Sequence, residues 1–331
     1  MSRKFIITDR RGGLGDSLLN IAAAWYLGHC YNRDVIVDWR RLPYTLTSWD
    51  TYERHHINLF SSLFGCPAPL EGVKFFFPEN FPEIALGPKA SDGFPADLDH
   101  LPLLDQHERD LKKAENLLNG PLYIRTSMRM GQANRCFSRL RTVNCPNFNF
   151  WNFLVSLPIA GPVADRLDHF HPGKFSSNEG KKFPSADGGF TNPTVAVHFR
   201  HGNGEKIMGR GSNWIDSKKG TQIIREEAEK FLGKDLNKFN FFICSDSPSG
   251  EKFLKESLPN SFSFPKSLPA EGDSSIHFNT DLNPVASLQE SFIDMMLMAK
   301  CSHIMYTQHS TFSMAARFNI PKANQRMLFK I

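Results

Sequence analysis

Four polar residues in the second half of the chain come just after apolar segments, at the points where those segments end. They are Arg200, Asp246, Ser310 and Thr311. An arginine fork bonds two phosphate oxygens at once, and hydroxyls at the start of a helix add donors beside a favourable dipole. Arg200 alone would fit an ordinary surface ion pair equally well. The convergence of all four residues favours a binding site for a diphosphate.

Two more polar residues lie inside apolar segments, where an unpaired polar group is costly. Asp294 interrupts the run 292–299, and His198 interrupts the run 195–199. A guanine ring presents an N–H and an NH2 group side by side, which match the two oxygens of a carboxylate. The alternatives are that Asp294 is exposed or pairs with a lysine or arginine, and that His198 is a core histidine bonded to backbone. We expect both residues to contact a nucleotide.

The glycine-bearing loop that follows Arg200 contains two further candidates, His201 and Glu205. Glycines let the backbone approach a ligand closely, so this loop is expected beside the ligand. Glu205 is the first candidate for a general base, and Asp216 is the next. The alternative for each carboxylate is a solvated loop residue.

The first half of the chain contains a glycine-rich turn with Gly12, Gly13 and Gly15. Leu18 occupies the position of the last glycine of a dinucleotide-binding fingerprint, so that fingerprint is not supported. Asp16 is expected to cap the following helix, because its carboxylate can accept a free N–H of the first turn. The turn therefore predicts a strand–turn–helix unit.

No metal site is expected. The triplet Asp97-Leu98-Asp99 has the composition that holds Mg²⁺ or Mn²⁺ on a diphosphate, but no apolar strand precedes it and two prolines flank it. Such a short pattern matches often by chance, so a solvated loop is the favoured interpretation. The six cysteines are scattered and form no Cys-x-x-Cys pair, which argues against a zinc or redox motif.

The elements that must position these residues follow from the spacing of apolar side chains. Strands are predicted at residues 5–8, 35–38, 122–124, 195–199, 240–244, 262–264 and 304–306. Helices are predicted at residues 18–26, 150–157, 220–232, 250–258, 286–300 and 310–318. This alternation predicts an α/β fold with two domains, 1–185 and 186–331, after a linker-like stretch at 171–193. In such sheets ligands bind at the carboxyl ends of the strands.

The composition excludes several classes of protein. The 331 residues are 40% hydrophobic and 22% charged, which is typical of a globular protein. No apolar run reaches the roughly 18 residues of a membrane helix, and the N-terminus lacks a secretory apolar region. The net charge of +5 is too diffuse to indicate nucleic acid and fits a small anionic ligand. With the scattered cysteines, this composition predicts a reduced, cytoplasmic protein without a transmembrane segment.

The motifs together resemble those of the NodZ-type nodulation fucosyltransferases, in the α1,6-fucosyltransferase family. The longest match is the run Val197-His198-Phe199-Arg200-His201-Gly202-Asn203-Gly204-Glu205. Shorter matches, in the same order along the chain, are Arg10-Arg11-x-Gly13-x-Gly15-Asp16, Asp38-Trp39-Arg40, Trp214-x-Asp216-Ser217, Cys244-Ser245-Asp246-Ser247, Ile293-Asp294-Met295 and the Ser310 segment. The stretch from residue 41 to 190 is unmatched, so the resemblance bears mainly on donor binding.

The resemblance implies a GT-B-like fold, in which two Rossmann-like domains face each other across a cleft. The N-terminal domain would lie on the acceptor side, and the C-terminal domain would bind the nucleotide sugar. By match, Arg200 would hold the β-phosphate, His198 and Asp294 the guanine, and Ser310 the diphosphate. The turn at 12–15 would approach the donor from the first domain.

The resemblance also implies an inverting, metal-independent transfer of fucose from GDP-β-L-fucose. The acceptor would be an N-acetylglucosamine-type glycan such as a chito-oligosaccharide, joined through an α1,6 linkage. As the bond to fucose breaks, negative charge grows on GDP, and Arg200 would stabilise that charge where a metal otherwise would. Glu205 would take the proton of the acceptor hydroxyl. Two alternatives stay open: a transferase using another GDP-sugar or acceptor, and a GDP-sugar-binding protein without transfer activity.

Overall fold

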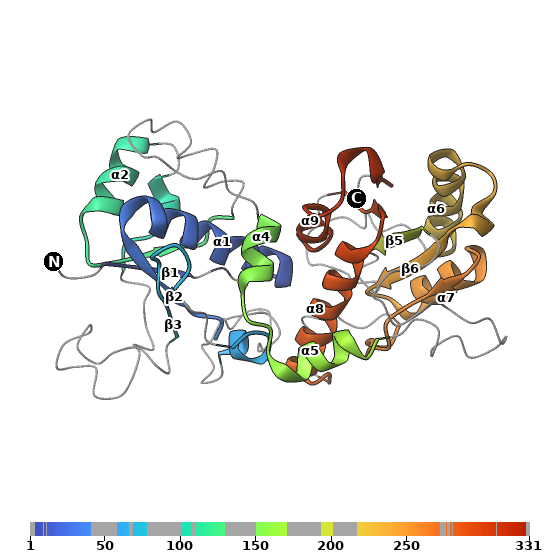
Figure 1. The fold of residues 1–331 in the computed structure, drawn as a ribbon, viewed down its shortest axis with the longest axis horizontal. Helices are drawn as coiled ribbons and strands as arrows, with labels where there is room; N and C mark the ends of the chain where they lie inside the picture. The colour runs from blue at the N-terminus through green and yellow to red at the C-terminus, as the bar shows by residue number, and fades with distance from the viewer. Residues whose placement is uncertain are drawn as a thin grey trace. The chain divides into compact units, whose positions relative to one another are not determined.

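The computed structural model divides into two compact units, Met1–Ala160 and Gly161–Ile331 (Figure 1). It describes residues 4–8, 10, 12–40, 58–65, 69–77, 101–107, 110–129, 150–170, 193–200, 217–271, 276, 279, 281–308 and 310–328. The division lies before the boundary expected at 185–186. Helix α5 (Gly161–Asp168) packs on helix α8 (Pro284–Lys300), so this segment joins the second unit.

The first unit contains a parallel sheet in the order β3-β2-β1-β4. Its strands are β1 (Lys4–Thr8), β2 (Arg33–Val37), β3 (Phe75–Phe76) and β4 (Tyr123–Thr126). Its helices are α1 (Leu14–Tyr31), α2 (Leu111–Asn119) and α4 (Phe150–Ser156), with short 3-10 turns at Leu59–Ser62 and Leu104–His107. Because α1 connects two parallel strands, β1, α1 and β2 form the predicted strand–helix–strand unit.

The second unit contains a parallel sheet in the order β7-β6-β5-β8-β9. Its strands are β5 (Thr194–Phe199), β6 (Asn240–Ser245), β7 (Ser261–Phe262), β8 (His303–Tyr306) and β9 (Gln325–Met327). Its remaining helices are α6 (Ser217–Leu232), α7 (Pro248–Ser257) and α9 (Thr311–Arg317), with 3-10 turns at Leu236–Lys238 and Lys322–Asn324. Each strand predicted from the sequence is present, so the α/β fold class is confirmed.

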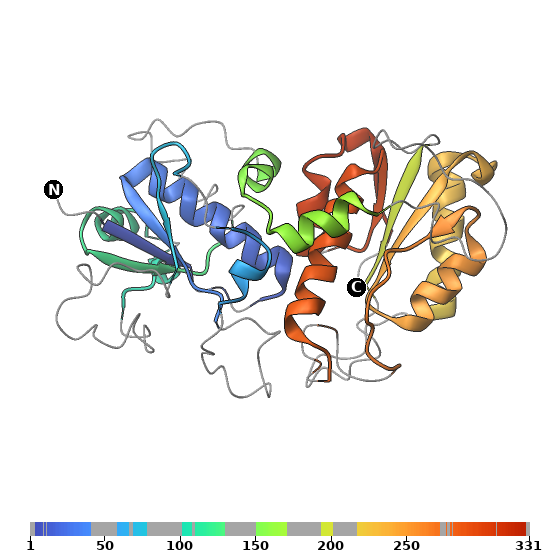
Figure 2. The same cartoon turned by 60° about the horizontal axis from the view of Figure 1, so that its bottom comes forward.

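The two faces of the second sheet bury different side chains, because successive residues of a strand point to opposite faces. Val195, Val197 and Phe199 of β5 pack in one apolar cluster with Ile224 of α6 and Leu254 of α7. Figures 1 and 2 show α6 and α7 on this face of the sheet and α8 on the other. The intervening residues of β5, which include His198, therefore face α8.

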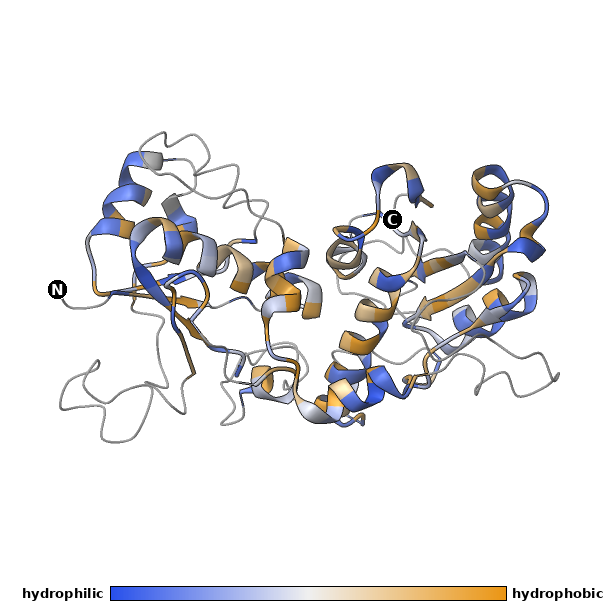
Figure 3. Ribbon diagram, in the orientation of Figure 1, coloured by the Kyte–Doolittle hydropathy of each residue, from blue (hydrophilic) through white to orange (hydrophobic). Residues whose placement is uncertain are grey.

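Hydrophobic residues are frequent along the strands of the sheets (Figure 3). Most of α1 and α8 is buried, whereas α6 and α7 are amphipathic and bury one side. None of the helices among the described residues is long and apolar enough to cross a membrane.

The cysteines differ from the sequence prediction at one position. Cys244 and Cys301 are free and buried, as expected of cysteines that pack as small apolar side chains. Cys30, near the end of α1, takes part in a disulfide bond. Scattered cysteines without a short motif gave no sign of this bond, and the expectation of a fully reduced protein is wrong at Cys30.

Candidate functional site

The ends of β5 and β8 are joined by a threonine that follows β8. The Thr307 hydroxyl donates to the carbonyl of His198 at 3.2 Å and accepts from the backbone N–H of Arg200 at 3.1 Å. Thr307 is buried, so neither bond competes with water. The backbone at Arg200 is therefore fixed at the carboxyl edge of the second sheet.

The side chain of Arg200 is oriented by Asp246, which follows β6. The Arg200 Nε lies 3.7 Å from Asp246 Oδ2, and the two side chains are 30% and 15% exposed. This contact corresponds to the ion pair considered as the alternative for Arg200. The guanidinium is only partly covered, so the pairing sets its direction and leaves N–H donors for a ligand.

His198 is enclosed and uncharged. Its imidazole packs against the ring of Phe312 from α9, with 5.4 Å between ring centroids. Burial lowers the pKa of His198 to about 3; Asp246 acts in the opposite direction, and Arg200 and Lys266 reinforce the lowering. The residue is therefore neutral at pH 7, and its Nδ1 has no hydrogen-bond partner.

Asp294 of α8 is buried and paired with a lysine that the sequence analysis did not single out. Lys266 Nζ lies 2.5 Å from Asp294 Oδ2, and both side chains are only 3% exposed. The Cys244 thiol of β6 donates to the same oxygen at 3.2 Å. The pairing alternative for Asp294 is thus realised at Oδ2, while Oδ1 is buried without a donor.

Buried polar atoms without partners gather in this part of the second unit. Nine such side-chain atoms occur among the described residues, and four of them belong to residues at or beside this edge. The four atoms are His198 Nδ1, Asp294 Oδ1, Gln308 Oε1 and Ser310 Oγ. Because the large majority of buried polar atoms in proteins are satisfied, such a group indicates a place where a ligand supplies the missing partners.

The glycine turn of the first unit has a different internal structure from the one expected. Gly13 is the N-cap of α1 and makes no side-chain cap, and Asp16 instead pairs with Arg10 at 3.4 Å and Arg129 at 3.3 Å. The prediction that Asp16 caps the helix is therefore wrong, because the helix begins at Leu14 with Gly13 as its N-cap and Asp16 already lies inside the first turn. A Cβ on Gly12 would lie 2.8 Å from the Asp16 Cβ, so this close approach requires glycine.

The predicted site residues fall into three groups. Gly12, Gly13 and Gly15 lie at the start of α1 in the first unit. The second unit brings together His198, Arg200, Asp246 and Asp294, and Ser310 is the N-cap of α9, whose Thr311 begins the helix and whose Phe312 packs on His198. His201, Glu205 and Asp216 lie outside the described residues.

Sequence analysis did not single out Lys266 as a contributor, and it placed Thr307 and Gln308 at the end of the last strand without assigning them a role. Lys266 is the one charged residue in the stretch Ser261–Leu268, which was a signal that it is buried and paired. Thr307 and Gln308 immediately follow an apolar strand, the same position that identified Arg200 and Asp246.

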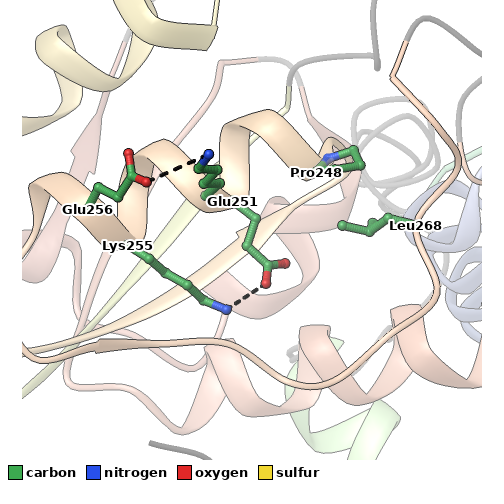
Figure 4. Close-up of a pocket in the computed structure, with 6 residues that line it drawn as sticks. Pro248, Glu251, Lys255, Glu256 and Leu268 are labelled. Carbon is green, nitrogen blue, oxygen red and sulfur yellow. Dashed lines mark hydrogen bonds and ion pairs between the residues drawn. The ribbon is translucent and has the colours of Figure 1, made fainter. Parts of the chain in front are cut away.

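A groove of about 400 Å³ runs beside α7 and is drawn in Figure 4. Its charged walls are already paired within the helix, because Lys255 Nζ lies 2.7 Å from Glu251 and Lys252 Nζ lies 4.0 Å from Glu256. These charges offer little to a ligand, so the groove is a weaker candidate than the edge of the sheet.

His, Cys, Asp and Glu side chains in the described part of the chain do not gather in groups of three that could hold a metal ion. Asp97 and Asp99 lie outside that part.

The comparisons with known proteins agree with this site. Residues 187–328 match the model of the Nodulation protein Z (NodZ) family, and this range contains the whole candidate site of the second unit. Nodulation protein Z of Azorhizobium caulinodans is 27% identical over 320 residues, which cover 93% of this chain and 87% of that protein.

Solved structures show the same fold over nearly the whole chain. Fucosyltransferase NodZ from Bradyrhizobium aligns with a TM-score of 0.58 and 19% identity, covering 97% of this chain and 94% of that one. A NodZ α-1,6-fucosyltransferase soaked with GDP-fucose aligns with a TM-score of 0.56 and 19% identity, covering 96% and 93%. These alignments confirm the predicted two-domain, Rossmann-like fold of the GT-B type. The family model and the curated relatives show that this chain is similar to NodZ proteins, and the solved structures show that it shares their fold.

Proposed function

We propose that the chain is a fucosyltransferase that uses GDP-β-L-fucose, inverts the anomeric centre and requires no metal. The acceptor we propose is an N-acetylglucosamine-type glycan, such as a chito-oligosaccharide, with an α1,6 linkage formed. The proposal draws on the NodZ family model and on relatives whose names include nodulation protein Z and α-1,6-fucosyltransferase.

The observation that carries the proposal is the group of four buried polar atoms without partners at the edge of the second sheet. A guanine nucleotide offers what these atoms lack. Its base has N–H donors for Asp294 Oδ1 and both donors and acceptors for His198, while Ser310 Oγ can donate to a phosphate oxygen.

Arg200 supplies the charge stabilisation. Its partly covered guanidinium, oriented by Asp246, is suited to bind the β-phosphate with two N–H groups. As the bond between the anomeric carbon and the phosphate oxygen breaks, the carbon becomes oxocarbenium-like and the oxygen takes the electron pair. A preorganised arginine stabilises that developing negative charge and so lowers the barrier.

The acceptor hydroxyl attacks the opposite face of the sugar and loses its proton to a base. We propose Glu205 for this role and Asp216 as the next candidate, since both follow the donor-binding strand in the sequence. A single displacement of this kind inverts the configuration at the anomeric carbon.

The first test is transfer from GDP-fucose to a chitin oligomer, with and without EDTA, and with GDP-mannose as the matched donor control. We expect a fucosylated product at the same rate in EDTA, and none from GDP-mannose. A loss of activity in EDTA would contradict the metal-independent mechanism. Tight binding of GDP-fucose without any product, over a panel of acceptors, would favour a GDP-sugar-binding protein instead.

A second prediction concerns the base. We expect Glu205→Gln to lower kcat by about 10²–10⁴-fold and to leave the Kd for GDP unchanged, because the amide cannot accept the proton. Asp216→Asn is the matched variant, and single-turnover rates with GDP-fucose and a chitin oligomer distinguish the two. If Glu205→Gln turns over near the wild-type rate while Asp216→Asn does not, the base is Asp216.

A further inference from the structure

Lys266 is a lysine enclosed in the second unit. It lies after β7, its side chain is 3% exposed, and its Nζ is 2.5 Å from Asp294 Oδ2. Lysine is almost never fully buried unless it is paired. Burial acts to lower the pKa of Lys266, but Asp294, Cys244 and Glu251 outweigh it and hold that pKa above its usual value. Lys266 therefore carries a full positive charge at neutral pH.

The donors around Asp294 are distributed unevenly between its two oxygens. Lys266 and the Cys244 thiol both donate to Oδ2, whereas Oδ1 is buried with no donor among the described residues. An unsatisfied buried acceptor costs free energy, and burying an ion pair is favourable only when its remaining hydrogen-bonding positions are satisfied. The arrangement is accounted for if Oδ1 receives its donor from a bound molecule.

We propose that Lys266 is a positioning residue that fixes the Asp294 carboxylate so that Oδ1 receives an N–H of the donor's purine base. This inference rests on the proposed function, since it names how that same site recognises its nucleotide. Lys266 holds the carboxylate through Oδ2 and Asp294 alone touches the base. The ligand class is a purine nucleoside diphosphate whose base carries ring and exocyclic N–H groups on one edge.

If Lys266 has this role, its removal should make nucleotide binding depend on pH. Burial raises the pKa of Asp294, and Lys266 and the Cys244 thiol oppose that rise, while Glu251 of α7 adds to it. Removing Lys266 removes the strongest opposition, so the carboxyl takes up a proton at a higher pH than in the wild type. The protonated carboxyl is a poorer acceptor, so nucleotide affinity in the variant increases as pH rises.

His198 is a second titratable group within reach of Lys266, whose charge helps to lower the pKa of the imidazole. Loss of Lys266 therefore changes the pKa of both Asp294 and His198. The double variant Lys266→Met/Asp294→Asn separates them, since a pH dependence caused by Asp294 disappears in it and one caused by His198 persists.

The experiment is calorimetric measurement of the Kd for GDP between pH 6 and pH 8.5. The proteins are the wild type, Lys266→Met, Asp294→Asn and the double variant, with Lys252→Met, on the exposed side of α7, as the matched control. The ratio of variant to wild-type Kd removes the ionisation of the nucleotide itself. Thermal unfolding of each protein establishes that it is folded.

We expect Lys266→Met to bind GDP about tenfold or more weakly than the wild type at pH 6.5. The ratio of the variant Kd to the wild-type Kd should fall towards 1 as the pH rises to 8.5. Asp294→Asn and the double variant should be equally weak at neutral pH, and the double variant should be insensitive to pH, because the pH dependence assigned to Lys266 acts through the carboxylate. Lys252→Met should match the wild type. If Lys266→Met does not fold, Lys266→Gln, which retains a donor without the charge, takes its place with the same expectation.

The two proposals fail in different ways. If the wild type does not bind GDP at all, the proposed function is wrong. If the wild type binds GDP and Asp294→Asn weakens it, but the lysine variant keeps the wild-type affinity at every pH, the role of Lys266 is wrong and the proposed function stands. A pH dependence that persists in the double variant also overturns the role assigned to Lys266.

Discussion

Arg200→Lys is expected to lower kcat for fucosyl transfer by about 10²–10³-fold, with a smaller effect on the Kd for GDP. The side chain of Arg200 is directed by Asp246, and its backbone is fixed by Thr307. A lysine at this position keeps the charge but not the planar pair of N–H donors, so it cannot hold two phosphate oxygens in a defined geometry. The loss should appear mainly in kcat, because the charge on the phosphate is greatest in the transition state.

Steady-state kinetics with GDP-fucose and a chitin oligomer, combined with calorimetric GDP binding, test this expectation. Arg225→Lys is the matched control, since Arg225 lies on α6 with half of its side chain exposed, pairs with Glu229 of the same helix and donates to the Ser257 carbonyl of α7. The proposed role is contradicted if Arg200→Lys keeps kcat within about threefold of the wild type while Arg225→Lys behaves the same.

The sequence was sufficient for the fold class because the strands of both sheets are short, apolar and bounded by polar residues. In a parallel sheet both faces are covered, so its strands are nearly continuous apolar runs such as 195–199 and 240–244. Two of the elements that were missed lack such runs, whereas the missed strand β3 (Phe75–Phe76) is too short to be recognised from its run. Strand β9 (Gln325–Met327) lies at the sheet edge with two polar residues, and α2 exposes most of its lysine and glutamate side chains.

The sequence predicted those site residues that lie at or just after the end of an apolar strand. His198, Arg200 and Asp246 were found because they end strands that lie side by side. The partner of Asp294 could not be found in this way, since Lys266 lies 28 residues away in an irregular segment and only the packing of α8 brings it close. The cap assigned to Asp16 was wrong for a local reason, because the helix begins before this residue, and the arginine that pairs with Asp16 from a distance, Arg129, follows β4.

Arg33→Met is expected to destabilise the first unit by about 3–5 kcal/mol. Arg33 begins β2, and only 1% of the residue is exposed. Its guanidinium donates to backbone carbonyls and to no carboxylate among the described residues. The shortest of these bonds are to Leu118 at 2.6 Å and Pro121 at 2.8 Å, and others reach Leu117 and Phe5.

These carbonyls belong to different elements, so the single Arg33 side chain links the end of α2 to the sheet. Leu117 and Leu118 lie in the last turn of α2, where carbonyls have no partner inside the helix, and Phe5 belongs to β1. Burial lowers the pKa of Arg33 to about 10, so the guanidinium still carries its charge at neutral pH. Methionine fills part of the volume but donates nothing, and each buried carbonyl left without a donor costs about 1–3 kcal/mol.

Urea unfolding followed by tryptophan fluorescence measures this loss, since four of the five tryptophans precede residue 161 and report mainly on the first unit. Arg33→Lys should fall between the wild type and Arg33→Met, because three donors on one ammonium cannot reach both the helix end and the strand. Arg225→Met, on the surface of the second unit, should change the free energy of unfolding by less than about 1 kcal/mol. A loss below about 1 kcal/mol for Arg33→Met would mean that water or a rearranged α2 satisfies these carbonyls, and that Arg33 does not hold the helix end to the sheet.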